Sequence, residues 1–189
     1  DGQQESDVDD IIFSGLRENI ESGKLVASLV ETPAQGLAEG LFSLASALPR
    51  DRASNMMLLY TRLACMFKPN FPLAEILIGD ILMSRKRFKD AVESYGKVAS
   101  VSGYSWTAQL RTADALYEDG RLDEAQVLLE NMGNLRPRRL DALLRLGNFF
   151  RFKERYSEAV EVYDRMFARL EEPKKEDWNL FYARGIALE

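Results

Sequence analysis

Two consecutive stretches of 34 residues decide the fold of this chain. They read SWTAQLRTADALYEDGRLDEAQVLLENMGNLRPR at 105–138 and RLDALLRLGNFFRFKERYSEAVEVYDRMFARLEE at 139–172. A small residue recurs at the step of 34, within Ile78-Gly79-Asp80, Thr112-Ala113-Asp114 and Leu146-Gly147-Asn148. Alanine recurs at the same step in Lys89-Asp90-Ala91, Asp123-Glu124-Ala125 and Ser157-Glu158-Ala159, and a large side chain recurs as Tyr95, Leu129 and Tyr163. Self-similarity at such a period is the signature of a repeat protein.

The three columns have a common physical explanation. Glycine inside a helix costs about 1 kcal/mol relative to alanine, so Gly79 and Gly147 predict a place where a second helix approaches very closely. The alanine column would lie on that second helix, and the large column would fill the space beside the crossing, as dense protein interiors require. Short polar segments between the columns have the length of turns between antiparallel helices. The sequence therefore predicts helical hairpins.

These columns resemble the tetratricopeptide repeat over roughly residues 72–171. The resemblance implies an all-α fold, an α-solenoid of antiparallel hairpins, with repeats at 71–104, 105–138 and 139–172. One period earlier, 34–70 reads as a degenerate hairpin whose columns hold Ala45 and Met57. Met57 departs from the alanine column, which predicts a looser crossing there.

The two ends of the chain do not follow the repeat. Residues 1–33 read as an acidic tail and a capping helix with an apolar face of Val8, Ile11, Ile12, Leu16 and Ile20. The alternative is that this helix occupies the groove as a self-blocking ligand. Residues 173–189 read as the first helix of a truncated further repeat after the charged linker 171–176. Its apolar side chains, from Trp178 to Leu188, predict a fragment of a longer bacterial repeat protein and a possible homodimer through exposed terminal helices.

Composition excludes several classes of function. The chain has no histidine, which rules out Ser-His and Cys-His catalysis and zinc helices of the HExxH type. One cysteine, Cys65, cannot close a Cys/His metal site, and its apolar helical context predicts a core position. We therefore expect no enzyme, no cofactor and no metal. A net charge of -5 disfavours general nucleic-acid binding, and no apolar run spans a bilayer. The compartment, cytoplasmic or periplasmic, is left open.

The first helices of successive hairpins line one face of such a stack, and residues one period apart share an orientation. The candidate groove therefore consists of apolar, acidic, amide and basic positions on those helices: Phe42, Ile76, Asp80, Met83, Leu110, Asp114, Tyr117, Leu144, Asn148 and Arg151. Such a surface suits a peptide with apolar anchors and a basic group. The alternative interpretation is that the apolar members pack helix against helix and that the acidic ones are solvated.

The partner expected from this surface is a protein or peptide. The carboxylate clamp found in some members of the family is not expected, since only Arg111 among the matching positions is suitable. A basic region at residues 136–155 could meet an acidic protein or RNA, but its side chains spread around the helix, which favours a solvated face. The competing functional hypothesis is a structural spacer or self-association platform that makes its contacts through the repeat ends.

Overall fold

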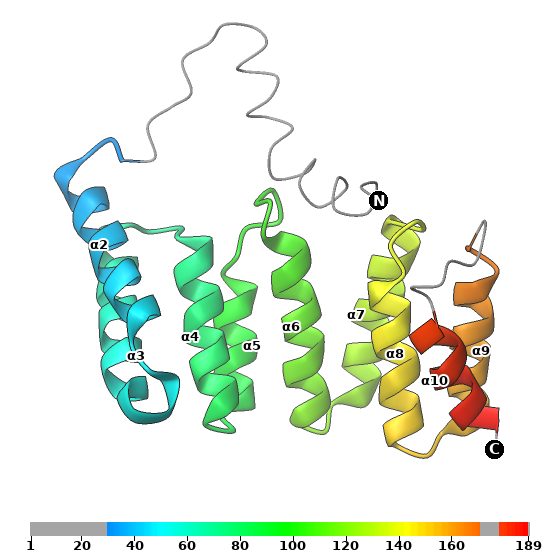
Figure 1. Ribbon diagram of the computed structural model, residues 1–189. Coiled ribbons are helices and arrows are strands. Elements are labelled where there is room, and N and C mark those ends of the chain that lie inside the picture. The colour runs from blue at the N-terminus through cyan, green and yellow to red at the C-terminus, as the bar shows by residue number, and fades with distance from the viewer. Residues whose placement is uncertain (1–29, 171–177, 189) are drawn as a thin grey trace, which may run out of the picture. The chain divides into compact units, whose positions relative to one another are not determined.

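The computed structural model describes residues 30–170 and 178–188, and within these ranges it contains helices and no strands (Figure 1). The helices are α2 (Pro33–Ala47), α3 (Arg50–Phe67), α4 (Pro72–Ser84), α5 (Phe88–Gly96), α6 (Ser105–Glu118), α7 (Leu122–Leu135), α8 (Asp141–Phe152), α9 (Tyr156–Phe167) and α10 (Trp178–Leu188). The prediction of an all-α helical solenoid is confirmed. The expected apolar segment from Val8 to Ile20 and the linker 171–176 lie outside the described residues.

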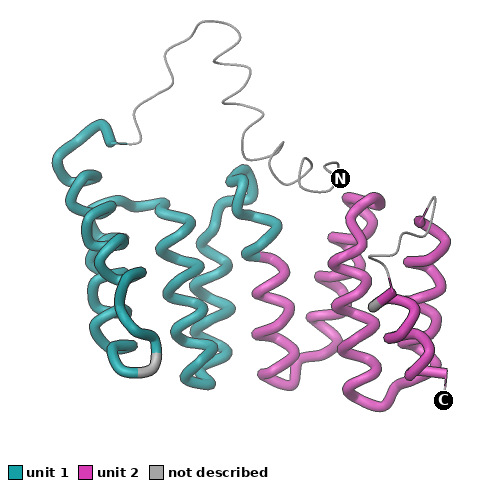
Figure 2. Tube along the Cα trace, viewed as in Figure 1, with its two compact units in different colours: residues 1–108 teal, residues 109–189 magenta. Residues whose placement is uncertain are grey.

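The chain divides into two compact units (Figure 2). Unit 1 ends at Ala108 and contains α2 to α5 with the start of α6, whereas unit 2 begins at Gln109 and continues to α10. In unit 1, α2 packs on α3, α3 on α4 and α4 on α5. In unit 2, α7 packs on α8, α8 on α9, and α10 on both α9 and α8. Each unit is thus a succession of helices packed mainly on their neighbours in sequence.

The close crossing predicted from the glycine column is present in two hairpins. A Cβ atom added to Gly79 on α4 would lie 2.2 Å from Cε1 of Tyr95 on α5. In the same way, a Cβ atom added to Gly147 on α8 would lie 2.4 Å from Cε1 of Tyr163 on α9. Real Cβ contacts are not this short, so the tyrosine ring occupies the volume that any side chain at the glycine would need. Gly79 and Gly147 are therefore required by packing.

The turns inside the regular hairpins repeat as well. Lys86, Gly120 and Glu154 stand 34 residues apart and all have positive φ, at 58°, 80° and 59°. This left-handed residue closes the first helix, because the next amide donates back to a carbonyl five residues earlier, as from Arg87 N to Leu82 O at 2.9 Å. The same arginine then pairs with the acid three residues on, Arg87 with Asp90 at 2.6 Å. Its counterparts pair likewise, in Arg121–Glu124 and Arg155–Glu158.

The hairpin α2–α3 solves the crossing differently. Its small-residue position holds Ala45, while Met57 stands at the alanine position and Thr61 at the tyrosine position. All three are buried, with Met57 1% and Thr61 0% exposed, and the Thr61 hydroxyl donates to the Met57 carbonyl at 2.6 Å. The large side chain has moved by one helical turn, so the crossing is filled although the column is broken. The hairpin also lacks the arginine–acid pair: Ala53 occupies the arginine position and interrupts α3 with φ -119° and ψ 17°.

None of the helices in the described part of the chain is both long and apolar enough to cross a membrane.

Candidate peptide-binding surfaces

The predicted groove residues all lie on first helices of hairpins, divided between the two units. Unit 1 contains Phe42 on α2 and Ile76, Asp80 and Met83 on α4. Unit 2 contains Leu110, Asp114 and Tyr117 on α6 and Leu144, Asn148 and Arg151 on α8. The two sets are therefore described separately.

Packing inside unit 1 accounts for two of the apolar positions. The Phe42 ring lies 5.0 Å from the Phe71 ring between centroids and packs against a buried cluster that includes Ala38 and Ala74. Ile76 is only 8% exposed. Ile76 therefore presents little surface to a ligand, and Phe42 is half-buried because it packs against the start of the next hairpin.

Asp80 is tied to the glycine–tyrosine crossing described above. Its Oδ1 accepts a hydrogen bond from the Tyr95 hydroxyl at 2.8 Å. Tyr95 itself is 2% exposed, so this bond links the hydroxyl of a buried tyrosine to a carboxylate at the surface of α4. Asp80 has a structural role, and its carboxylate is also half-exposed on the same surface as the half-buried Met83.

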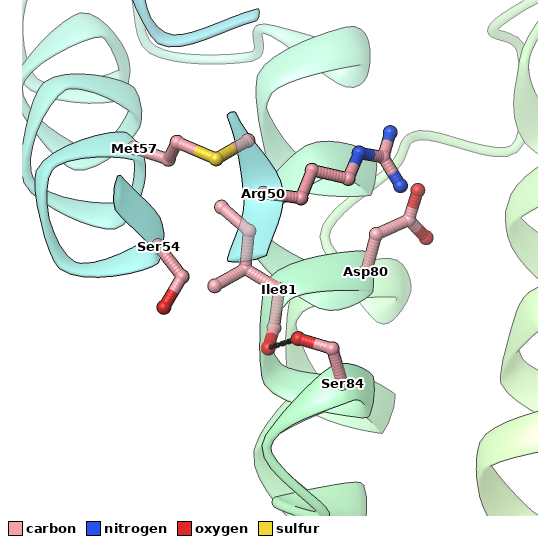
Figure 3. A pocket seen from close by; sticks show the side chains of 6 residues that line it. All are labelled: Arg50, Ser54, Met57, Asp80, Ile81 and Ser84. Carbon is pink, nitrogen blue, oxygen red and sulfur yellow. Dashed lines mark hydrogen bonds between the residues drawn. The ribbon is translucent and has the colours of Figure 1, made fainter. Parts of the chain in front are cut away.

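A pocket of about 250 Å³ opens beside Asp80, between α3 and α4 (Figure 3). Its lining consists of Arg50, Ser54 and Met57 from α3 and Asp80, Ile81 and Ser84 from α4. Met57 and Ile81 are buried and form its apolar part. In Figure 3 the guanidinium of Arg50 and the carboxylate of Asp80 point toward each other on one side of the pocket.

The remaining polar groups of the pocket are held in place by internal bonds. The Ser84 hydroxyl donates to the Ile81 carbonyl at 2.7 Å, and Arg85 donates from Nη2 to the Ser54 hydroxyl at 2.9 Å. The pocket is smaller than the roughly 300–1,000 Å³ that encloses a drug-sized ligand. Its size and its apolar floor suit a single side chain, with charge available at the rim.

Of the six residues that line this pocket, the sequence had predicted only Asp80 as a site residue. Arg50, Ser54 and Met57 lie on a second helix, whereas the predicted groove residues were taken from first helices alone. The signal that could have revealed them is the irregularity of the hairpin itself, because a methionine at the alanine position changes the shape of the surface beside it.

In unit 2, Asp114 is compensated by an arginine from the next hairpin. Arg145 Nη1 bonds to Asp114 Oδ2 and also donates to the Leu110 carbonyl at 3.0 Å. Burial raises the pKa of the Asp114 carboxyl above its usual value, and the charges of Arg145 and Arg111 act in the opposite direction. The acidic edge expected at this position is therefore largely neutralised within the protein.

Aromatic contacts define the neighbouring part of the same surface. The Tyr117 ring stacks on Phe149 with 4.2 Å between centroids and 15° between planes, and Lys153 Nζ lies 5.2 Å from the Tyr117 centroid. Tyr117 is thus held against α8 while its edge remains partly exposed.

Asn148 and Arg151 surround the buried tyrosine of hairpin α8–α9. The Tyr163 hydroxyl donates to Asn148 Oδ1 at 2.9 Å. Burial raises the pKa of Tyr163, and Arg151 acts in the opposite direction. The Arg151 guanidinium lies 4.4 Å from the centroid of Phe152, while its Nε is buried without a hydrogen-bond partner. Leu144 remains partly exposed one turn before Asn148.

Several members of the basic region 136–155 are paired within the chain. Arg139 bonds to Asp141 at 2.8 Å, and Arg145 and Arg155 bond to Asp114 and Glu158. These pairs divide the region among several partners, so the described part of it does not form one uncompensated positive stripe.

Cys65 packs against the same apolar cluster as Phe42. Burial, followed by the nearby Glu75 carboxylate, raises the pKa of its thiol to about 11. A thiol with this pKa is almost entirely protonated at neutral pH and is a poor nucleophile. Among the described residues, no three His, Cys, Asp or Glu side chains are grouped as a metal site would require.

Comparison with known proteins agrees with the fold. Residues 142–176 match the family model described as tetratricopeptide repeat. The chain is similar to the crystal structure of MamA protein, with a TM-score of 0.61 and 16% identity over 80% of each chain. It is also similar to MamA 41-end from Desulfovibrio magneticus RS-1, with a TM-score of 0.60 and 17% identity over 84% of this chain and 92% of that one.

A further similar structure is YrrB, described as a TPR protein with an unusual peptide-binding site. Its TM-score is 0.54 at 14% identity, over 93% of this chain and 81% of that one. Identities this low show a common fold. None of the curated protein sequences matches the chain.

Proposed function

We propose that this tetratricopeptide-repeat protein is an interaction scaffold that binds a peptide segment of a partner protein at a pocket between α3 and α4 and on the exposed surface of its first helices. The observation that carries the proposal is the pocket between α3 and α4. Peptide recognition by helical folds relies on apolar anchors that enter grooves between helices. In this proposal the pocket receives one apolar side chain, with the charges of Arg50 and Asp80 at its rim.

Three properties of the pocket support this assignment. Its apolar part is formed by Met57 and Ile81, which are both core residues. Its hydroxyl groups already have internal bonds, so an apolar ligand leaves none of them unsatisfied. Charges of both signs stand at one side, where they can fix the direction of a bound peptide without being buried.

The surface of unit 2 supplies a second set of candidate contacts. Leu110 and Leu144 remain partly exposed, and Tyr117 presents an aromatic edge. Asp114 contributes little charge to a ligand, because Arg145 neutralises it. We therefore propose that unit 2 offers a separate surface of apolar and aromatic contacts, with Asn148 and Arg151 as polar neighbours.

The proposal is tested by selecting peptides from a displayed random library on the full chain. The best peptide is then titrated calorimetrically against wild type and against Ser84→Trp, which places an indole in the pocket from its rim. Ser157→Trp, at an exposed serine on α9, is the matched control. We expect Ser84→Trp to weaken binding at least tenfold and the control to leave it unchanged. Equal binding by all three proteins would show that the pocket is not the site.

A self-association role is the second candidate, and the exposed aromatic surface of α10 favours it. Trp178 is 65% and Tyr182 62% exposed, and their rings contact each other at 6.0 Å between centroids. Sedimentation of wild type and of Trp178→Lys/Tyr182→Lys tests this role. A dimer that dissociates in the double variant supports it, and a monomer at high micromolar concentration excludes it.

A further inference from the structure

The outer face of α3 differs from the outer faces of the other second helices. Four apolar residues follow helical spacing along it: Met56, Leu59, Leu63 and Met66. Three of them are exposed, with Met66 at 75%. We call these four residues the α3 stripe. Their spacing of three and four residues puts them on one side of the helix.

The repeat period shows that this stripe is not a general property of the fold. At the same positions the other second helices hold mostly polar residues: Asp90, Glu93, Lys97 and Ser100, then Glu124, Val127, Asn131 and Asn134, then Glu158, Glu161, Arg165 and Ala168. Val127 and Ala168 are the exceptions among twelve positions. The outer faces of the second helices in the regular hairpins are therefore mostly polar, as expected of a surface exposed to water. The outer face of α3 is apolar, which favours contact with another segment.

The neighbouring helix α2 also exposes apolar side chains. Leu44 is 47% exposed, whereas its counterparts at the same repeat position, Ile78 and Leu146, are 5% and 0% exposed. Leu37 is 49% exposed, whereas its counterpart Phe71 is 4% exposed. Packing covers the apolar side chains at these three later positions. In α2 the described residues leave the equivalent positions open. An apolar surface of this kind marks a site of contact.

We propose that residues 8–20 of this chain form an amphipathic helix that packs on the α3 stripe and on the adjacent surface of α2. Val8, Ile12, Leu16 and Ile20 recur every four residues and give that segment one apolar side. A helix of this length is about 20 Å long. The α3 stripe runs over about 15 Å, so the two apolar surfaces match in length.

Charge favours the same pairing. The segment 1–21 contains one basic residue, Arg17, and the acidic residues Asp1, Glu5, Asp7, Asp9, Asp10, Glu18 and Glu21. Helix α3 has the opposite balance, since it contains three arginines and one aspartate, and both Arg52 and Arg62 are exposed beside the stripe. Opposite charges at the rim of an apolar contact orient the two surfaces and disfavour wrong pairings.

The length of the connection makes the contact local. Residues 21–32 join the segment to α2, and twelve residues span at most about 40 Å. Helix α3 is about 27 Å long. A short tether raises the effective concentration of the segment near α3 far above that of any separate molecule, so a second copy or another protein competes at a disadvantage.

The experiment is hydrogen exchange on the full chain, followed by mass spectrometry, in wild type and two variants. Leu59→Glu places a charge in the middle of the α3 stripe. Val127→Glu is the matched control, because Val127 is exposed and occupies the same repeat position on α7. We expect amides in residues 8–20 to exchange at least tenfold more slowly than in an unstructured chain. This protection should be lost in Leu59→Glu and kept in Val127→Glu, while amide exchange in helices α4 to α9 stays unchanged in both.

Four results would overturn the proposal. Unprotected residues 8–20 in wild type would show that no docked helix exists. Protection that survives Leu59→Glu but is lost in Ser84→Trp would place the segment at the pocket instead. Protection that disappears on dilution would show that a second copy provides the contact. Equal loss in Leu59→Glu and Val127→Glu would show an effect of charge alone.

A cross-link locates the contact directly. In a Cys65→Ser background, Leu16→Cys is combined with Leu59→Cys or, as the control, with Val127→Cys. We expect a short bismaleimide to join the first pair within one molecule at least tenfold faster than the second pair. Equal rates would overturn the proposal independently of the exchange data.

Discussion

Hairpins α2–α3 and α4–α5 are neighbours in unit 1, yet they fill the same crossing in two ways. In α4–α5 a glycine leaves room for a tyrosine ring, with Gly79 against Tyr95. In α2–α3 the bulk comes from Met57, one turn earlier, and Thr61 stands where the tyrosine would be. The difference teaches that the repeat conserves a filled volume at the crossing, while the residue that supplies the volume can change place.

The two hairpins also differ in how they face their surroundings. The outer side of α5 presents Asp90 and Glu93, whereas the outer side of α3 presents Met56 and Leu59. The regular turn of α4–α5, with Lys86 at positive φ and the Arg87–Asp90 pair, has no equivalent at Ala53 of α3. The irregular hairpin is thus altered at its crossing, at its turn and on its outer face together.

The largest effect on stability is expected from Met57→Ala. This change gives hairpin α2–α3 the alanine of the regular hairpins but not the tyrosine that fills the crossing in α4–α5 and α8–α9. Removing a methionine that is 1% exposed should lower the free energy of unfolding by about 2–4 kcal/mol. Urea denaturation measures the change. Val127→Ala, at an exposed position, is the control and should cost less than about 0.5 kcal/mol. A loss below 1 kcal/mol for Met57→Ala, on the order of a surface change, would mean that Met57 does not fill the crossing.

The next effect tests the regular hairpin. Gly79→Ala brings a Cβ atom into the Tyr95 ring and should cost about 1–3 kcal/mol. The hairpin α6–α7 holds Ala113 and Leu129 at these two positions, so adding Tyr95→Leu should recover part of the loss. A double-mutant cycle should therefore give a favourable coupling of at least about 1 kcal/mol.

A matched glycine provides the control for that cycle. A Cβ atom at Gly40 on α2 would have no neighbour within 4 Å. Gly40→Ala should accordingly stabilise the protein by up to about 1 kcal/mol through helix propensity. If Gly79→Ala were also stabilising, or if its effect were additive with Tyr95→Leu, the close crossing would not constrain the sequence.

A smaller effect distinguishes the two glycine–tyrosine hairpins. Tyr95 donates to the carboxylate of Asp80, whereas Tyr163 donates to the amide of Asn148. Because hydrogen bonds to charged groups are stronger, Tyr95→Phe should cost about 1.5 kcal/mol and Tyr163→Phe about 1 kcal/mol. Thermal and urea unfolding measure both. The reverse order would indicate that solvent weakens the bond to Asp80 more than its charge strengthens it.

The smallest expected effect is on the pKa of Cys65, which lies near Glu75 of the next hairpin. Burial is the first cause of the raised thiol pKa, so Glu75→Gln should lower the pKa from about 11 while leaving it above 9. The rate of iodoacetamide alkylation as a function of pH measures this pKa. Lys68→Gln, which removes a pair with Glu39 on α2, is the control and should leave the rate unchanged.

The same thiol gives a pH dependence with a definite sign. The folded-state pKa of about 11 lies above the ordinary thiol pKa of 9.0. The unfolded chain therefore loses this proton first, and the contribution of Cys65 to stability is complete below pH 9 and is lost between pH 9 and 11. Cys65→Ser should remove that part of the alkaline loss. An unchanged alkaline profile in Cys65→Ser would contradict the assignment.

The parts of the fold that could be predicted from sequence are those in which a residue type recurs every 34 residues. The close approach at Gly79 and Gly147, with a large residue near the crossing, followed from volume. The sequence matched these glycines with the alanine column, whereas in the structure the tyrosine rings lie against them. The arginine–acid pairs of the turns also follow the period, but the sequence alone did not indicate that Arg121 and Glu124 would bond to each other.

The candidate site was less predictable, because its contacts cross the columns. Arg145 neutralises Asp114 from a position 31 residues away, and the repeat period of 34 does not relate these two positions. The pocket beside Asp80 requires Arg50 and Ser54 from a second helix in the irregular hairpin. Ile76 and Leu110 occupy the same repeat position, but Ile76 is buried and Leu110 is partly exposed. Exposure therefore depends on the neighbouring helix as well as on the repeat position.

The packing of each helix mainly on its neighbours in sequence also determines how this chain unfolds. Where most contacts are local, folding is fast and stability is close to a sum of terms for hairpins and their interfaces. Heat should then open the chain in stages, with different midpoints for probes placed in hairpins α2–α3 and α8–α9, so that a single melting temperature describes neither. A substitution weakens its own hairpin first, and a partner that binds one unit protects that unit while the other still exchanges with solvent.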